Sequence, residues 1–141
     1  MEELIELRQS IIAGNYTKAL QVIDELEEMS VEDKLNKMYS YMVILLLHLI
    51  KQQAEQKTTR SWKNSIVNSA EQINRVNKRR KSGGYYARKE DLQEIIDEAF
   101  PRALRDAALE AFGGAYQEEQ LLEMIDVAKI KQEAINLVKS E

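Results

Sequence analysis

The chain has 141 residues, of which 44% are apolar, 31% charged and 6% aromatic, and its formal net charge is -4 at pH 7. This composition is too apolar for a disordered chain, and the length suffices for one domain with a buried core. Because the chain has no Cys and one His, disulfides, thiolate catalysis, Cys-ligated metal centres and sites that need two histidines are excluded.

The first 29 residues predict a helical hairpin. Apolar residues recur at helical spacing within residues 2–13. Gly14-Asn15 then favours a stop, because both residues tolerate the left-handed conformation at a helix end. A second short helix over residues 16–28 would complete the hairpin.

Residues 30–82 predict the two main helices of the fold. Ser30 is a favourable N-cap for a long helix over residues 31–56, whose apolar residues surround it nearly completely, as is typical of a buried central helix. After a short polar connection, an amphipathic helix is expected over residues 61–81, ended by Ser82-Gly83-Gly84. Trp62 begins its inner apolar stripe, which indicates a core anchor, with a stacking platform for a base as the alternative.

Residues 85–141 predict a set of acidic helices. Pro101 is expected to break or restart the first of them, because proline fits the first turn of a helix and not its middle. Gly113-Gly114 marks the end of the next helix, and Asp126 is a candidate cap that divides the last helical region.

No segment has the period-two pattern of a strand. The sequence therefore predicts an all-α fold, a single compact bundle of six to eight helices around the long central helix. Residues 1–141 are expected to form one domain.

Charge is segregated along the chain. Residues 57–89 contain ten Lys or Arg and one acid, so this segment, the basic block, carries +9. Residues 1–56 carry -5 and residues 90–141 carry -8. A basic block between acidic ones can bind an anionic partner, the acidic helices of the same chain, or a second copy.

Residues 45–73 read LLLHLIKQQAEQKTTRSWKNSIVNSAEQI, in which a Leu-rich helix, a short spacer and an amphipathic helix follow one another. This pattern resembles the core signature of family twenty-nine of the domains of unknown function, a helical family abundant in cyanobacteria. The chain departs from that signature by having Ile50 in place of a Leu and Arg60 directly before Ser61. The resemblance implies an all-helical fold and no described activity or cofactor. It marks four motif positions without a known role: His48, Lys51, Arg60 and Trp62.

His48 is the one candidate for proton transfer near neutral pH. Catalysis would need a nucleophile or a carboxylate within hydrogen-bond reach, and no local spacing supplies one. We therefore expect a structural histidine that bridges the central helix to the next one, near Arg60 and Trp62. No catalytic residue is assigned.

The basic block contains the best candidates for contact with an anion or a nucleic acid: Arg75, Lys78, Arg79, Arg80, Lys81, Tyr85 and Tyr86. Cations on an exposed helix face can follow a phosphate backbone, and adjacent aromatic rings can stack on unpaired bases. The alternative is that the acidic residues 90–110 fold against these cations and cover them.

The acidic clusters lack the motifs of known metal sites, and no phosphate-binding loop is present, so no metal or cofactor is expected. The N-terminus does not read as a secretory signal, and no apolar run is long enough for a membrane span. We therefore expect a cytoplasmic protein without a membrane partner.

The sequence is compatible with three functional hypotheses. The first is a non-enzymatic module for protein–protein interaction or self-association, which makes a homo-oligomer or a protein partner the expected assembly. The second is a nucleic-acid-binding regulator, or an antitoxin-like factor, that uses the basic helix 61–81. The third is an enzyme that uses His48.

Overall fold

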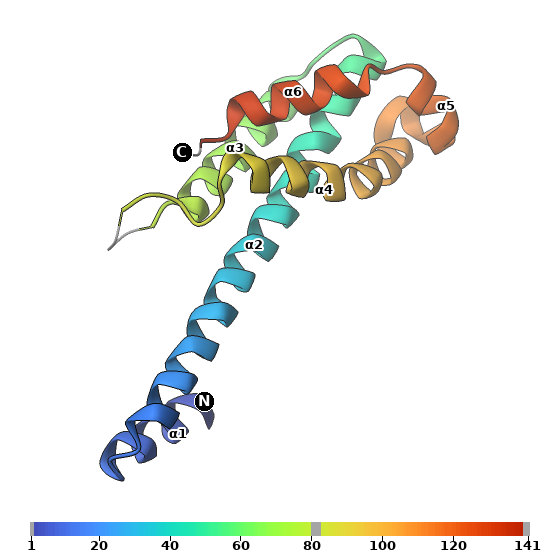
Figure 1. Ribbon diagram of the computed structural model, residues 1–141. Coiled ribbons are helices and arrows are strands. Elements are labelled where there is room, and N and C mark those ends of the chain that lie inside the picture. Colours follow the sequence, from blue (N-terminus) through green and yellow to red (C-terminus); the bar gives the residue numbers. More distant parts are fainter. Residues whose placement is uncertain (1, 80–82, 140–141) are drawn as a thin grey trace. The chain divides into compact units, whose positions relative to one another are not determined.

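The computed structural model describes residues 2–79 and 83–139 (Figure 1). The elements in chain order are α1 (Glu2–Ile12), α2 (Tyr16–Glu55), α3 (Arg60–Asn77), α4 (Lys89–Glu110), a short 3-10 helix η1 (Ala111–Gly114), α5 (Glu118–Glu123) and α6 (Val127–Leu137). No strand occurs within the described ranges, so the predicted all-α fold of six to eight helices is confirmed. The chain divides into two compact units, an N-terminal unit (Met1–Leu35) and a C-terminal unit (Asn36–Glu141).

The N-terminal unit consists of α1 and the first part of α2, joined by a tight turn. The predicted stop at Gly14-Asn15 is confirmed, because α1 ends at Ile12 and α2 begins at Tyr16. Gly14 has a φ of 75°, a conformation that glycine adopts at no steric cost. The side chain of Asn15 then accepts a hydrogen bond from the backbone N–H of Lys18 at 3.2 Å, which caps the start of α2.

The predicted interruption near Ser30 is wrong, because α2 is one continuous helix. Residues 16–55 contain neither Gly nor Pro, the two residues that most strongly end a helix. An N-cap residue stabilises a helix start only where the preceding backbone has left the helix. At Ser30 nothing forces that departure, so the helix continues.

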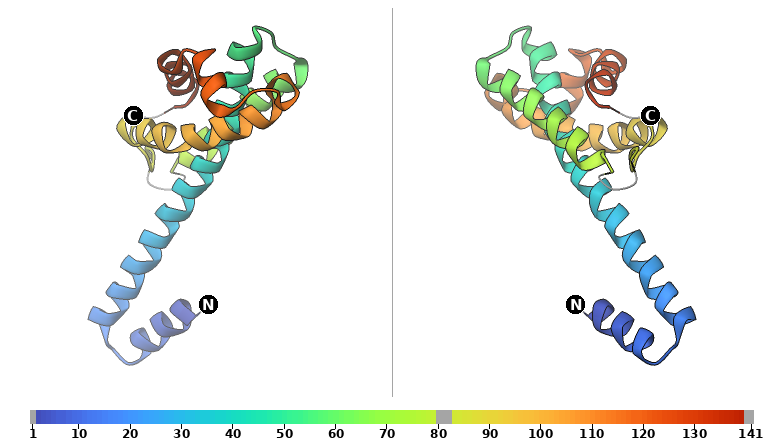
Figure 2. Two further views of the ribbon diagram at one scale, coloured as in Figure 1. Left: turned by 90° about the vertical axis from the view of Figure 1, so that its right-hand side faces the viewer. Right: turned by 90° about the vertical axis from the view of Figure 1, so that its left-hand side faces the viewer.

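The core of the C-terminal unit surrounds the second part of α2. Met38, Met42, Leu45, Leu46 and Ile50 are fully buried there. Within this unit, α3, α4 and α6 gather around that stretch of α2 (Figure 2), and α4 contacts α5 and α6. The expectation of a central helix with neighbours on several sides is thus met by residues 36–55.

The amphipathic helix α3 ends at Asn77, four residues earlier than predicted, so Lys78 and Arg79 are not helical. The chain instead turns back on itself: the Tyr86 N–H donates to the Asn77 carbonyl at 2.9 Å, and the Arg79 N–H donates to the Gly84 carbonyl at 3.0 Å. We call residues 78–79 and 83–88 the return segment. Its pairing supplies backbone hydrogen bonds outside the helix, which is why the helical pattern of the sequence does not continue.

The expected break at Pro101 is also wrong, because α4 runs through this proline. Pro101 is exposed, whereas Phe100 directly before it and Ala103 two residues after it are buried. A proline inside a helix removes one hydrogen bond and disfavours the helix by about 3 kcal/mol. The buried face of α4 offsets this loss, so apolar packing decides the outcome.

The C-terminal end of the fold follows the sequence closely. As predicted, the helix before Gly113-Gly114 ends there, with η1 as its last turn. Asp126 separates α5 from α6, as predicted. The carboxylate of Asp126 accepts a hydrogen bond from the Lys129 N–H at 3.2 Å and caps α6.

Asn77 is fully buried, and both polar atoms of its side-chain amide are hydrogen-bonded. Its oxygen accepts from the Ala87 N–H at 2.7 Å, and its nitrogen donates to the carbonyls of Ala87 and Lys139, both at 3.2 Å. This one side chain therefore joins the end of α3, the return segment and the segment after α6.

We expect Asn77→Ala to lower the free energy of unfolding by about 2–4 kcal/mol, because it leaves backbone groups of Ala87 and Lys139 without partners. Urea unfolding measures the loss. Asn68→Ala is the matched control, since Asn68 is exposed on the same helix and should change stability by less than about 0.5 kcal/mol. Equal effects of the two substitutions would contradict the role assigned to Asn77.

Candidate functional site

Lys51 on α2 is a buried cation, with only 7% of its surface exposed. Its Nζ lies 3.1 Å from Glu110 Oε1, at the end of α4, and 4.5 Å from the centre of the Trp62 ring on α3. A buried charge is tolerated only when it is paired and hydrogen-bonded. The carboxylate and the indole ring together meet that need and join three helices at one point.

The start of α3 sets the position of Trp62. Thr59 is the N-cap, and its Oγ1 accepts from the Trp62 N–H at 3.1 Å. The indole is half-buried, and Lys57 Nζ also lies 5.8 Å from its ring centre. Trp62 therefore packs beneath lysine side chains at the edge of the core rather than deep inside it.

His48 is half-buried on α2, and its Nδ1 lies 2.9 Å from the Ile44 carbonyl oxygen. A carbonyl only accepts, so Nδ1 carries the proton and Nε2 is left as the acceptor in the neutral ring. The hydrogen bond found here runs within α2. The sequence-based expectation was a bridge to the next helix, and the described hydrogen bonds do not include one.

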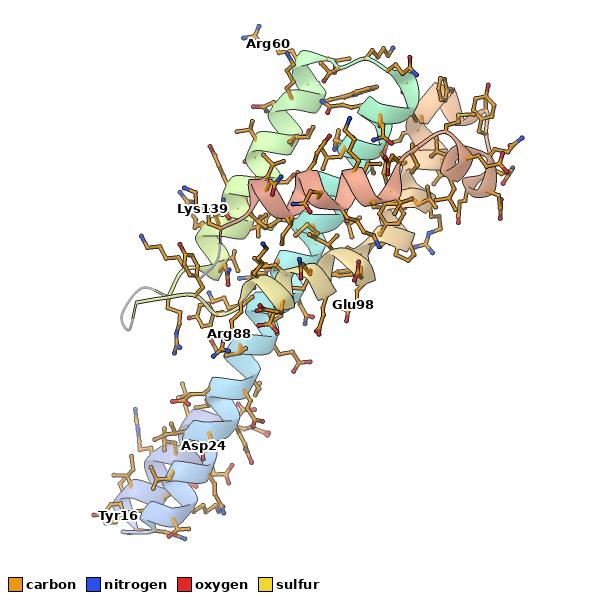
Figure 3. All side chains as sticks on the ribbon, turned by 45° about the horizontal axis from the view of Figure 1, so that its top comes forward. Tyr16, Asp24, Arg60, Arg88, Glu98 and Lys139 are labelled. Carbon is orange, nitrogen blue, oxygen red and sulfur yellow. The ribbon has the colours of Figure 1, made fainter. Side chains whose placement is uncertain are left out.

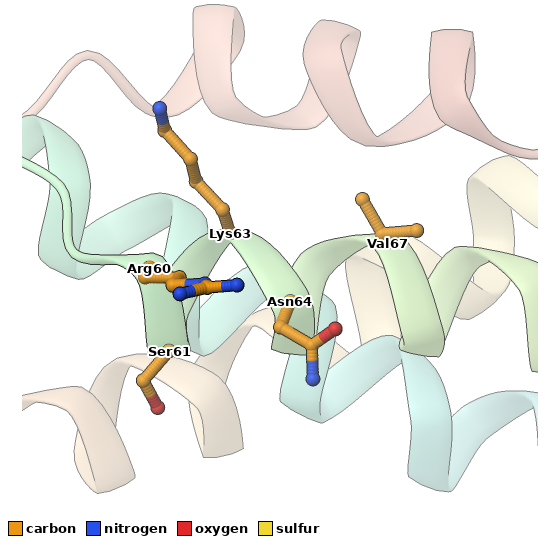
Figure 4. A pocket seen from close by; sticks show the side chains of 5 residues that line it. All are labelled: Arg60, Ser61, Lys63, Asn64 and Val67. Carbon is orange, nitrogen blue, oxygen red and sulfur yellow. The ribbon is translucent and has the colours of Figure 1, made fainter.

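Arg60 is the first residue of α3 and is exposed. Together with Ser61, Lys63, Asn64 and Val67 it lines a shallow, open hollow on the outer face of that helix. Lys63 and Ser61 leave the helix in opposite directions, and Arg60 lies between them (Figure 4). Of the four motif positions, Lys51 and Trp62 are thus in contact, whereas Arg60 faces solvent.

The cations of the basic block are placed by different elements. Arg75 is exposed on α3, and Lys78 and Arg79 are exposed in the return segment. Arg80 and Lys81 lie outside the described residues. Tyr85 and Tyr86 are half-buried, and the guanidinium of Arg79 lies 5.4 Å from the Tyr86 ring centre.

Sequence reasoning missed four residues that organise these groups: Asn74, Asn77, Glu110 and Lys139. The two asparagines follow Ala70 and Ile73 at a spacing of four, so they continue the apolar stripe of α3. A polar residue inside an apolar stripe is a signal for a buried hydrogen-bond network. Glu110 and Lys139 carry no comparable local signal, because their partners are about 60 residues away in the chain.

A protein-family model described as "Domain of unknown function DUF29" matches residues 15–127. The chain belongs to the DUF29 family. The match covers more than half of the chain and includes all four motif positions, which confirms the resemblance drawn from residues 45–73. No curated protein and no solved structure matches the DUF29 chain.

None of the helices described here is both long and apolar enough to cross a membrane. Over residues 2–79 and 83–139, no three His, Asp or Glu side chains gather as a metal-binding group.

We expect a measurable coupling energy between Lys51 and Trp62. In a double-mutant cycle with Lys51→Met and Trp62→Leu, the interaction term should be about 0.5–2 kcal/mol, because the ammonium lies over the ring and is desolvated. Urea unfolding of the four proteins gives this term.

Lys57 supplies the matched control, since it is exposed and lies farther from the same ring. The cycle with Lys57→Met and Trp62→Leu should give less than about 0.5 kcal/mol. A Lys51 term no larger than the Lys57 term would show that the buried lysine gains nothing from the indole.

Proposed function

We propose that this DUF29 chain is a self-associating module in which the N-terminal unit of one copy pairs with that of a second copy. The observation that carries the proposal is the exposure of large apolar side chains in this unit. The unit is small, and its two helical segments have little core of their own.

Burial in the N-terminal unit is sparse. Among its described residues only Ser10, Ala19 and Val22 are buried. Eight large apolar side chains are exposed in the same unit: Leu4, Ile5, Ile11, Ile12, Tyr16, Leu20, Met29 and Val31. A soluble monomer rarely leaves so many apolar side chains together at its surface, and such patches mark interaction sites.

The hairpin has a polar side and an apolar side. Lys18 Nζ and Glu6 Oε1 lie 3.5 Å apart and connect α2 with α1 on one side. At 100° per residue, and with the two segments antiparallel, the opposite side of the hairpin carries residues from both helices. These are Leu4, Ile11, Tyr16 and Leu20, which are 45%, 51%, 66% and 61% exposed.

A second copy fits this apolar side. Two helical hairpins packed face to face form a four-helix bundle, in which each copy covers the same patch of the other. The Glu6–Lys18 ion pair stays outside such an interface, so its charges remain solvated. The exposed apolar side is part of every copy of the chain. A second copy is therefore always present as a partner that could bury it.

We expect the chain to have a light-scattering mass of twice the 16.3 kDa of one chain, and the double variant Ile11→Asp, Leu20→Asp to be monomeric. Each aspartate would be buried without a partner in the dimer, whereas both positions are exposed in the monomer. Size-exclusion chromatography with light scattering over a concentration series measures the mass.

Val67→Asp with Leu109→Asp is the matched control, since both residues are exposed apolar side chains of the C-terminal unit. This control should keep the mass of the unaltered chain. A monomeric unaltered chain, or dissociation by both pairs of substitutions, would reject pairing through the N-terminal unit.

A further inference from the structure

We propose that the return segment and its surroundings bind single-stranded nucleic acid, with the phosphates on a cluster of cations around Asn77. This proposal is independent of self-association, because it concerns different residues. We define the Asn77 cluster as Lys78, Arg79, Arg88 and Lys139, with Arg75 on the last turn of α3.

Hydrogen bonds to one buried side chain join the backbone segments that carry these cations. Lys78 follows Asn77 directly, and Arg88 follows Ala87, whose N–H and carbonyl both bond to the Asn77 amide. The Lys139 carbonyl accepts from the same amide. Figure 3 shows Arg88 and Lys139 near the two arms of the return segment.

The backbone that carries the cations is fixed before any ligand arrives. Besides the Asn77 bonds, Lys78 pairs with Tyr85 in an antiparallel bridge, and the Lys139 N–H donates to Asn74 at 2.7 Å. Holding like charges near one another is unfavourable in the free protein. A phosphate backbone relieves that repulsion and releases its own counterions.

None of the ion pairs found among the described residues involves these cations. Arg75, Lys78, Arg79, Arg88 and Lys139 are all exposed. The ion pairs found among the described residues involve other basic side chains, namely Lys18, Lys51, Lys57, Arg102 and Lys131. The Asp91 carboxylate of α4 contacts the cluster through the backbone, since it accepts from the Arg88 N–H at 2.9 Å. The charged ends of the cluster side chains therefore remain available to a ligand.

Two aromatic rings favour a single strand over other polyanions. Tyr85 and Tyr86 are half-buried beside the cations, and Arg79 already lies over the Tyr86 ring. Unpaired bases stack on such rings and on guanidinium planes, whereas the bases of a duplex are not available for stacking. The described part of the return segment has no large aliphatic side chain that would enter a lipid surface.

The test uses fluorescence anisotropy of labelled oligothymidine and oligouridine of about 16 nucleotides, the upper end of single-strand site sizes. Comparison of the two separates DNA from RNA as the source of the phosphate backbone. Affinity should fall steeply with salt, with a logarithmic slope near -3 for about four phosphate contacts. A duplex of similar length should bind several-fold more weakly than the single strands.

Lys78→Glu with Arg88→Glu should weaken binding at least tenfold, and Lys139→Glu alone should weaken it to a smaller degree. Arg105→Glu with Lys129→Glu is the matched control, because it makes the same change in net charge at exposed positions outside the cluster. This control should lower affinity less than threefold. Circular dichroism and urea unfolding establish that each variant is folded.

Three results would overturn the proposal. One is the absence of oligonucleotide binding at low salt. Another is an equal loss of affinity in the cluster variant and the control, which would indicate attraction by net charge alone. The third is binding to phosphatidylserine vesicles, or to a peptide of residues 1–35, without any binding to the oligonucleotides.

Discussion

The side-chain amide of Asn77 fixes how the C-terminal unit is connected. The amide oxygen accepts one hydrogen bond and the amide nitrogen donates two. These bonds join the end of α3 to the return segment and to the segment after α6. An unpaired amide in the same place would be strongly unfavourable, so the arrangement holds only if all partners are present together. The geometry of the exposed cations depends on this buried group, because they are attached to the segments it joins.

Lys51 is a second buried polar side chain, and it contacts α3 near the start of that helix. Its charge is buried, and the carboxylate of Glu110 and the ring of Trp62 replace the water that it loses. No buried side-chain nitrogen or oxygen among the described residues lacks a hydrogen-bond partner. Buried polar residues of this kind favour one register of the helices, since a shifted register would leave them without hydrogen-bond partners.

The sequence predicted which faces are buried better than it predicted where helices end. Apolar spacing correctly indicated the central helix and the inner stripe of α3, because burial of a stripe follows directly from helical geometry. The predicted helix start at Ser30, the predicted helix end at Lys81 and the predicted break at Pro101 were wrong for a shared reason. At each position a local sequence signal was outweighed by an effect that extends over more residues. At Ser30 this effect is uninterrupted helix propensity, at the end of α3 it is pairing within the return segment, and at Pro101 it is the buried face of α4.

The candidate sites divide in the same way. Lys51 and Trp62 could be chosen from the motif, but their contact could not, since it depends on the spacer between α2 and α3 and on Glu110 from far along the chain. The cations of the basic block could be counted, yet the sequence placed Lys78 and Arg79 on a helix and gave no hint of Lys139. The backbone of Lys139 is hydrogen-bonded to Asn74 and Asn77, which lie more than 60 residues earlier in the chain. These bonds place Lys139 beside the return segment.

The two proposed surfaces differ in the force that they use, and this has a consequence for how they would act together. The N-terminal unit offers apolar area, whose burial is insensitive to moderate salt, whereas the Asn77 cluster depends on charge, which salt screens. A dimer would carry two such clusters, and binding of one cluster to a strand raises the effective concentration of that strand at the other. Weak, salt-sensitive contacts would then gain affinity from a salt-insensitive interface. Self-association would strengthen strand binding in this way without contributing any contact to the strand, and a single copy would still bind the strand by itself.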